Sequence, residues 1–95
     1  MAHRIYKYSL PDVALRGYAL IEMPKGAVFL SVQVQHNSPV AWVRVDPDQE
    51  KVLREIRVVT TGRHVVQDDL VYLGTVQLND GETVFHYFDK GEIPL

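Results

Sequence analysis

The chain has no cysteine among its 95 residues, which excludes disulfide bonds, thiol catalysis and cysteine-ligated zinc. It has no hydrophobic run near the roughly 20 residues that a membrane-spanning helix requires. Ten basic and 12 acidic side chains give a formal net charge of −2, so a broad basic surface is also lacking. We therefore expect neither a membrane span nor a partner that is an extended nucleic acid.

The residues that are present suffice for one domain. With 46% hydrophobic residues, the 95-residue chain can bury a core without help from metals or disulfides. We find no internal repeat and no linker, and the first residues, Met1-Ala2-His3-Arg4, have no signal-peptide character. The prediction is a single β-rich domain over residues 1–95 in the cytoplasm.

The hydrophobic residues recur with a period of two along most of the chain, which is the period of β-strands. The predicted strands cover residues 4–10, 18–23, 27–35, 40–45, 54–61, 70–78 and 82–89. The segment after Asp46 is ambiguous between helix and strand, and we favour a helical turn over residues 48–51 before the next strand. The predicted fold class is all-β and mostly antiparallel: a compact small sandwich or barrel of about seven strands with at most one short helical turn.

Two turns are predicted to close β-hairpins. Pro24–Gly26 combines proline, which presets φ, with glycine, which accepts a left-handed backbone. Asp80–Gly81 between two alternating runs is the strongest short hairpin signal in the chain. A two-residue loop there pairs Leu78 with Thr83, Val76 with Phe85, Thr75 with His86 and Gly74 with Tyr87.

The alternation around the only tryptophan predicts an outward-facing surface. In strand 40–45, Ala41, Val43 and Val45 are the natural inward set, so Trp42 and Arg44 face the opposite side. In strand 27–35 the inward set is Val28, Leu30, Val32 and Val34. Because tryptophan and arginine are common interface anchors, we predict a contact surface made of Phe29, Gln33, Gln35 and Trp42. The alternatives are that Trp42 belongs to the core or that a second sheet covers it.

A second candidate is the strand end at Thr61-Gly62-Arg63-His64. Backbone N–H groups at a glycine turn can bind an anion, and an arginine can grip phosphate through two hydrogen bonds. The simpler interpretation is a strand end with two polar surface residues. With a tryptophan to stack on a base and further arginines, the predicted ligand-binding set is Trp42, Arg44, Arg57, Thr61, Gly62, Arg63 and His64.

Catalytic and metal-binding motifs are missing. The chain has no G-x-S-x-G motif, and its histidines are scattered without the spacing of metal ligands. We therefore predict no metal, no cofactor and no catalytic residue. The weaker alternative is an enzyme that uses His64 or His86 as a general base.

Several segments occur in a characteristic order: IYKYSL, MPKGAVFLSVQVQ, a strand with a tryptophan, VDP, TTG, YLGTVQL and FHYF. From Ile5 to Phe88 this order resembles a family of small proteins encoded by bacteriophages and prophages. That family has no established function. The resemblance implies a phage gene product that acts in the bacterial cytoplasm or in the virion.

Two functions from different classes fit these observations. The first is a non-enzymatic binding protein that forms a homo-oligomer. It would sequester a host nucleotide-type signal, or another small anionic ligand, at its subunit interfaces, which is a counter-defence role. The second is a structural or assembly protein of the virion, or a module that binds a host protein.

Overall fold

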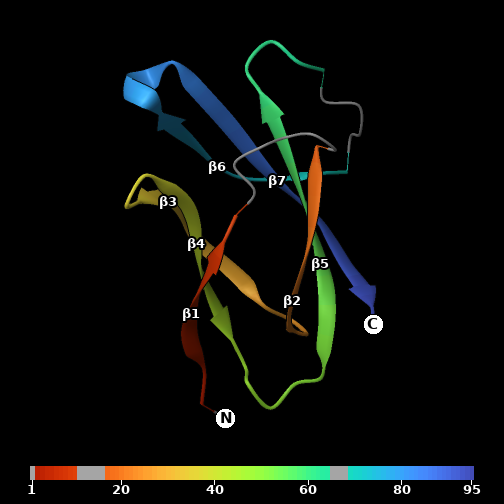
Figure 1. The fold of residues 1–95 in the computed structure, drawn as a ribbon. Coiled ribbons are helices and arrows are strands. Elements are labelled where there is room, and N and C mark those ends of the chain that lie inside the picture. Colours follow the sequence, from red (N-terminus) through yellow and green to blue (C-terminus); the bar gives the residue numbers. More distant parts are fainter. Residues whose placement is uncertain (1, 11–16, 65–68) are drawn as a thin grey trace.

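The computed structural model describes residues 2–10, 17–64 and 69–95 (Figure 1). The strands are β1 (Arg4–Ser9), β2 (Tyr18–Pro24), β3 (Val28–Gln35), β4 (Ser38–Val45), β5 (Lys51–Thr60), β6 (Val71–Leu78) and β7 (Thr83–Pro94). A short 3-10 turn, η1 (Asn79–Gly81), joins β6 to β7 and is the one helical element in the part of the chain that the structure describes. The predicted all-β, mostly antiparallel fold of about seven strands is confirmed.

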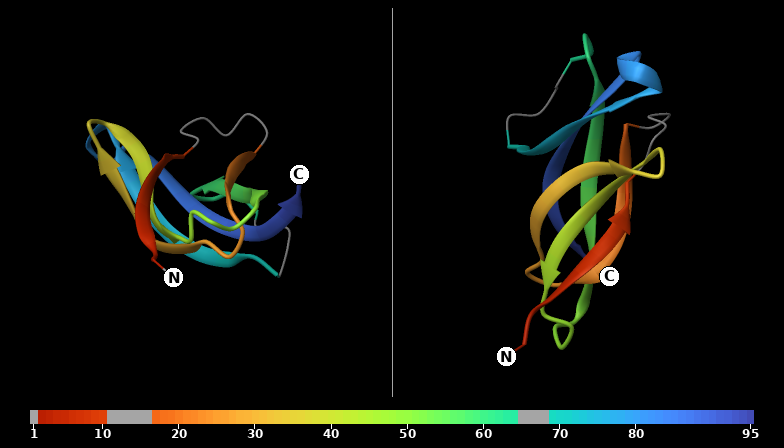
Figure 2. Two further views of the ribbon diagram at one scale, coloured as in Figure 1. Left: turned by 90° about the horizontal axis from the view of Figure 1, so that it is seen from below. Right: turned by 90° about the vertical axis from the view of Figure 1, so that its left-hand side faces the viewer.

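The strands form two antiparallel sheets that enclose a common interior. Sheet A has the order β1-β4-β3, and sheet B has the order β2-β5-β7-β6. Figure 2 shows the two sheets curving around the interior, and the edge strands β3 and β6 lie next to each other. Gly74 of β6 permits this approach, because a Cβ atom added there would lie 2.9 Å from Cβ of Val32 on β3.

The predicted hairpin at Pro24–Gly26 is wrong in its pairing. Gly26 does adopt a left-handed backbone, with φ +82°. However, β2 pairs with β5 and β3 pairs with β4, so this turn carries the chain from sheet B to sheet A. Turn residues determine where a chain reverses, whereas packing of the whole fold determines which strands then pair.

The β6–β7 hairpin has the predicted register. Leu78 pairs with Thr83, and the pairing continues through Thr75 with His86 to Gly74 with Tyr87. The loop is longer than predicted, because residues 79–82 separate the paired positions. Asn79, Asp80 and Gly81 all have positive φ angles, of 53°, 56° and 89°.

A β-bulge corrects part of the predicted alternation in β3. The register shifts between Phe29 and Ser31, so an extra residue interrupts the pleat there. Phe29 consequently packs toward the core, while Val28 and Leu30 are 42% and 49% exposed. Beyond the bulge Val32 packs against the core as predicted.

The predicted helical turn over residues 48–51 is also wrong. Asp46 does cap a turn, since its Oδ1 accepts a hydrogen bond from the backbone N–H of Asp48 at 3.0 Å. The chain is already extended at Lys51, where β5 begins opposite Pro24. The β-branched residues that follow gain more from pairing in the centre of sheet B than from a short helix.

The core lies between the inner faces of the two sheets. Its fully buried members include Met23, Ala41, Val43, Ile56 and Tyr87. The inward positions predicted for strand 40–45 are confirmed, because Ala41, Val43 and Val45 are at most 1% exposed. The outer faces of both sheets therefore carry the candidate sites.

Candidate binding surfaces

A chain of hydrogen bonds crosses the outer face of sheet B and is centred on His86 of β7. The ring bonds through Nε2 to the hydroxyl of Thr61 at 2.8 Å and through Nδ1 to the hydroxyl of Thr75 at 2.9 Å. The Thr75 hydroxyl is also hydrogen-bonded to the hydroxyl of Tyr72. We call these four residues the His86 network. Both ring nitrogens have partners, so the orientation of the imidazole is defined.

A row of aromatic side chains adjoins the His86 network. Strand register places Tyr18, Arg57, Phe88 and Tyr72 opposite one another across the four strands of sheet B. We call this set the aromatic row. The Arg57 guanidinium carbon lies 5.5 Å from the centroid of the Tyr18 ring, and the Phe88 and Tyr72 rings meet edge to face at 5.6 Å.

The charge in this row is locally neutralised. Nε of Arg57 donates a hydrogen bond to Oε2 of Glu55 at 2.8 Å. Glu55 lies on β5 like Arg57, and its side chain is only 11% exposed. An ion pair so well covered on a sheet face holds the guanidinium in place beside Tyr18.

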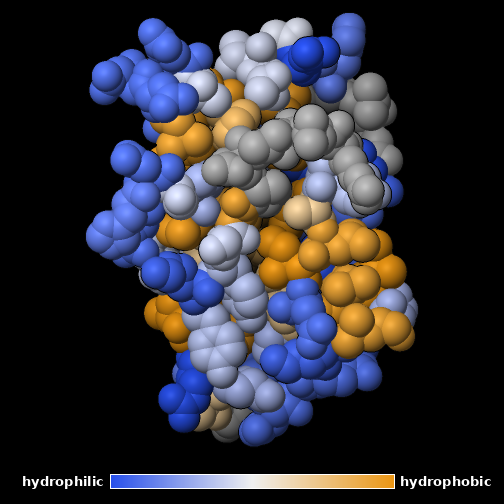
Figure 3. All heavy atoms as spheres, in the orientation of Figure 1, coloured by the Kyte–Doolittle hydropathy of each residue, from blue (hydrophilic) through white to orange (hydrophobic). Residues whose placement is uncertain are grey.

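Hydrophobic side chains extend this face toward the other end of the sheet. Leu20 and Ile93 are 47% and 38% exposed, and strand register places Leu53 opposite both Glu22 and Ile93. Figure 3 shows a hydrophobic area on the side of the molecule formed by β2, β5 and the end of β7. Outer faces of antiparallel sheets are usually polar, so this apolar and aromatic face is a candidate contact surface.

Trp42 and Arg44 lie on the outer face of sheet A, as the alternation predicted. Lys7 and Ser31 are the cross-strand neighbours of Trp42, and Arg44 pairs with Ile5 and Val28. Trp42 is half-buried among these neighbours and faces away from the core of its own chain. Whether it contacts a second subunit or a ligand stays a prediction.

Three of the four residues of the predicted interface set lie together on the outer face of sheet A, and their role as an interface stays a prediction. Gln33 and Gln35 share the outer face with Trp42, and Gln35 accepts a hydrogen bond from Nζ of Lys7 at 2.8 Å. Phe29 does not belong to this face. Its ring packs toward the core, with the Arg54 guanidinium 5.4 Å from its centroid, because the β-bulge reverses its direction.

The predicted ligand-binding residues do not converge within one chain. Trp42 and Arg44 lie on the outer face of sheet A, whereas Arg57 lies on that of sheet B. These two faces point away from each other across the core. A single pocket in one protomer is therefore excluded, and only an assembly of two or more chains would bring both groups to one ligand.

The stretch Thr61–His64 forms a tight turn at the end of β5. The backbone N–H of Arg63 donates to the carbonyl of Thr60 at 3.1 Å, and Gly62 has φ +91°. The Arg63 amide is thus used by the turn, not offered to an anion, while the side chains of Arg63 and His64 are exposed. A hollow of about 200 Å³ adjoins the turn, lined by Thr60, Thr61, Glu82, Thr83 and Val84.

The sequence patterns did not identify several residues of the His86 network and the aromatic row as site residues. The predicted hairpin register already paired Thr75 with His86, and the structure confirms that pair. The contact between Thr61 and His86 depends on pairing between β5 and β7, for which the sequence offers no local signal. Tyr18 and Phe88 join the site through the same long-range pairing.

Residues 2–10, 17–64 and 69–95 contain neither a candidate metal site nor a candidate membrane-spanning helix. In these ranges no group of three or more histidine, cysteine or acidic side chains is placed to hold a metal ion. The same ranges contain no helix of the length and hydrophobicity needed to cross a membrane.

Comparison with known protein families yields a match over nearly the whole chain. A family model described as "Domain of unknown function (DUF7352)" matches residues 1–94. No curated protein and no solved structure matches the chain significantly.

Proposed function

Because the chain belongs to this family of unknown function, we propose from its geometry that it is a non-enzymatic binding protein whose ligand lies on the outer face of sheet B. The observation that carries the proposal is the adjacency of the His86 network and the aromatic row. Hydrogen-bonding groups of fixed orientation lie directly beside flat aromatic surfaces. Binding sites commonly combine a few placed polar groups with an apolar and aromatic lining.

The chemistry of this face suits a nucleotide-type ligand. A base can stack on an exposed aromatic ring such as Tyr72, which is 58% exposed. The hydroxyls of Thr61 and Thr75 supply donors and acceptors for the base or the ribose. The exposed side chains of Arg63 and His64 follow Thr61 along the chain and can contact a phosphate.

Binding fits this face better than catalysis does. Both ring nitrogens of His86 are hydrogen-bonded to threonine hydroxyls, which leaves neither free to accept a proton from a substrate. Sequestration of a ligand requires affinity and no chemical step. A general-base role for His86 is therefore the weaker alternative.

The finer proposal concerns biological role and assembly. The motif resemblance supports a phage gene product in a bacterial cytoplasm that sequesters a host nucleotide signal as a counter-defence. The protein would be a homo-oligomer, with the Trp42 face of sheet A as the contact between subunits. The outer face of sheet B would hold the ligand, and the outer face of sheet A would contact a second copy of this chain.

A second candidate is an assembly protein, either of the virion or in a complex with a host protein. The observation in its favour is the set of exposed hydrophobic residues beside Trp42 on sheet A. Ile5 is 62%, Val28 is 42% and Leu30 is 49% exposed. Such a patch can dock another protein as well as a second copy of this chain.

A thermal-shift screen against cyclic and linear nucleotides tests the proposed function. A ligand present at about 100 times its dissociation constant stabilises a fold by about 2.7 kcal/mol, which gives a clear rise in melting temperature. Replacing Tyr72 by Ala should weaken the binding about tenfold or more, because one stacking contact is lost. Val71→Ala is the matched control, since Val71 is equally exposed on the same strand but lies outside the aromatic row.

The proposal fails if no nucleotide changes the melting temperature. It also fails if Tyr72→Ala binds the nucleotide as tightly as the parent chain does. A purified virion that contains the protein as a stoichiometric component would favour the assembly role.

A further inference from the structure

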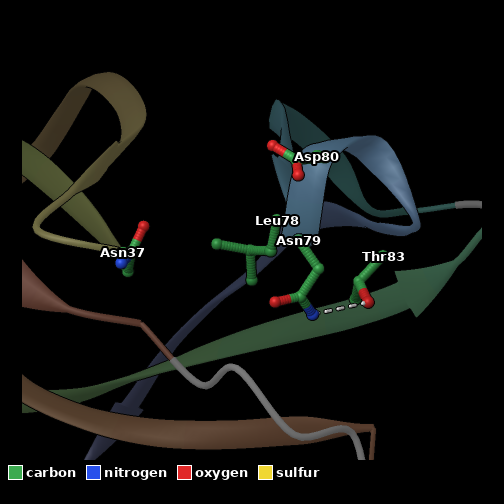
Figure 4. A pocket seen from close by; sticks show the side chains of 5 residues that line it. All are labelled: Asn37, Leu78, Asn79, Asp80 and Thr83. Carbon is green, nitrogen blue, oxygen red and sulfur yellow. Dashed lines mark hydrogen bonds between the residues drawn. The ribbon is translucent and has the colours of Figure 1, made fainter.

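A cleft separates two turns at one end of the sandwich. The first is the β3–β4 turn at His36 and Asn37, and the second is the β6–β7 turn that contains η1. The cleft has a volume of about 450 Å³, and the described residues that line it are Asn37, Leu78, Asn79, Asp80 and Thr83. Figure 4 shows Asn37 on one side, and Leu78 and Asn79 facing it from the other. None of these residues belongs to the His86 network or the aromatic row.

The described lining residues are polar apart from Leu78, and none of them is a lysine or an arginine. Two carboxamides, one carboxylate and one hydroxyl surround the partly buried Leu78. Nδ2 of Asn79 donates to the hydroxyl of Thr83 at 3.2 Å, and Figure 4 shows the carboxamide oxygen of Asn79 on the side of Leu78. The oriented amide thus presents a hydrogen-bond acceptor beside an apolar surface.

We propose that this cleft binds a neutral, hydroxyl-rich ligand, a mono- or disaccharide. Sugar hydroxyls both donate and accept hydrogen bonds, which suits a mixture of carboxylate, carboxamide and hydroxyl groups. The apolar C–H face of a sugar ring packs on an aliphatic side chain such as Leu78. An anion finds no lysine or arginine among the described lining residues. The volume lies within the range of small-molecule sites, roughly 300–1,000 Å³.

The backbone of the two turns is left-handed at most of the residues that line the cleft. Within the described chain, the non-glycine residues with positive φ are His36, Asn37, Asn79 and Asp80, and all four lie in these turns. Glycine suits a left-handed backbone better than any of them. Polar side chains thus occupy positions where the backbone alone favours glycine, and three of the four line the cleft.

This feature allows a test in which loss of binding cannot be confused with loss of folding. Replacing Asp80 or Asn37 by Gly removes a lining side chain and relieves the left-handed strain, so the melting temperature should stay the same or rise. His36→Gly is the matched control, because His36 shares the left-handed turn but does not line the cleft.

The probes are glucose, galactose, mannose, N-acetylglucosamine, maltose and cellobiose, titrated at millimolar concentrations into the 15N-labelled protein. At least one sugar should give saturable shifts in the backbone amides of residues 36–38 and 78–83. Asp80→Gly and Asn37→Gly should each weaken that sugar about tenfold or more, because a hydrogen bond is lost. His36→Gly should bind it within about twofold of the parent chain.

Three outcomes overturn the proposal. One is that none of the sugars saturates these amides. Another is that both glycine variants bind the sugar as tightly as the parent does. The third is that calcium chloride alone reproduces the shifts, which would make the cleft a cation site. A nucleotide on sheet B would shift residues of the His86 network instead, so this test is independent of the proposed function.

Discussion

Arg54 of β5 and Asp89 of β7 form a buried, multiply hydrogen-bonded ion pair. Nε of Arg54 lies 3.0 and 3.1 Å from the two carboxylate oxygens, and Nη2 lies 2.7 Å from Oδ2. The two side chains are only 13% and 11% exposed. Nη1 of Arg54 also donates to the carbonyl of Ala27 at 2.9 Å, so one guanidinium holds the crossover from sheet B to sheet A.

Replacing Asp89 by Ala should destabilise the protein by about 3–5 kcal/mol, because the buried guanidinium loses its hydrogen-bonded carboxylate and keeps only Glu92, at 3.8 Å, as an anionic neighbour. Urea denaturation measures the change. The double variant Arg54→Met with Asp89→Leu should recover most of the loss, since it removes both charges and keeps apolar volume.

The exposed ion pair between Lys25 and Glu50 serves as the control. Its N···O distance is 3.8 Å, and its side chains are 56% and 72% exposed. Lys25→Ala should change the unfolding free energy by less than about 1 kcal/mol. If Asp89→Ala also changes the unfolding free energy by less than about 1 kcal/mol, the structural role of the buried pair is contradicted.

Gly74→Ala should destabilise the protein by about 1–3 kcal/mol, because the added methyl group would lie 2.9 Å from Cβ of Val32 on the facing edge strand. The backbone conformation is not the cause, since Gly74 is not among the glycines with positive φ. Adding Val32→Gly, which removes that Cβ atom, should relieve the clash, so the double variant should lose less stability than the two single variants lose together. Urea midpoints of the two single variants and the double variant check this coupling, and simple additivity would show that the strands do not meet here.

Tyr8 should make the fold sensitive to alkaline pH. Burial disfavours the phenolate and raises the pKa of Tyr8 above its usual value of about 10, and the nearby Tyr6 adds to the effect. The folded state therefore keeps its proton at a pH where the unfolded chain loses it. The stabilising contribution is complete below pH 10 and is lost as the pH rises through the folded-state pKa.

Replacing Tyr8 by Phe should flatten the fall in stability above pH 10. Urea denaturation of the parent and Tyr8→Phe proteins between pH 8 and pH 11.5, roughly one unit or more on either side of the usual pKa, measures the difference. Equal slopes for the two proteins would show that Tyr8 titrates normally in the fold.

Trp42→Ala should leave the monomer folded but weaken self-association, because Trp42 faces away from the core and its outer-face neighbours include exposed hydrophobic residues. Arg44→Glu on the same face should act in the same direction. Light scattering of the parent protein should exceed the 10.8 kDa of one chain, and the variants should approach it. A parent protein that is monomeric at micromolar concentration, or a Trp42→Ala variant that unfolds, would contradict the contact role.

Some features follow from local sequence alone. The register of β6 with β7 was predictable because a short loop between two alternating runs allows few pairings, and the alternation of apolar residues selects among them. The same argument placed Trp42 outside the core, since Ala41, Val43 and Val45 fill one face of β4. In both cases the deciding interactions lie within a few residues along the chain.

Other features were decided only by the tertiary structure. The β2–β3 turn looks like a hairpin in sequence, but the packing of two sheets separates its strands, and the Arg54–Asp89 pair holds that crossover. The bulge that turns Phe29 inward arises where β3 pairs with β4.

The candidate site divides in the same way. The sequence by itself determined that there are about seven strands, the hairpin that pairs Thr75 with His86, and the outward face of Trp42, but not the start of β5 at Lys51 or the end of β7 at Pro94. Only the tertiary structure brought Thr61 to His86 and aligned Tyr18 with Phe88, because both depend on pairing β5 between β2 and β7. The choice of partner for a strand is a competition among distant segments, and burial of the whole core decides it.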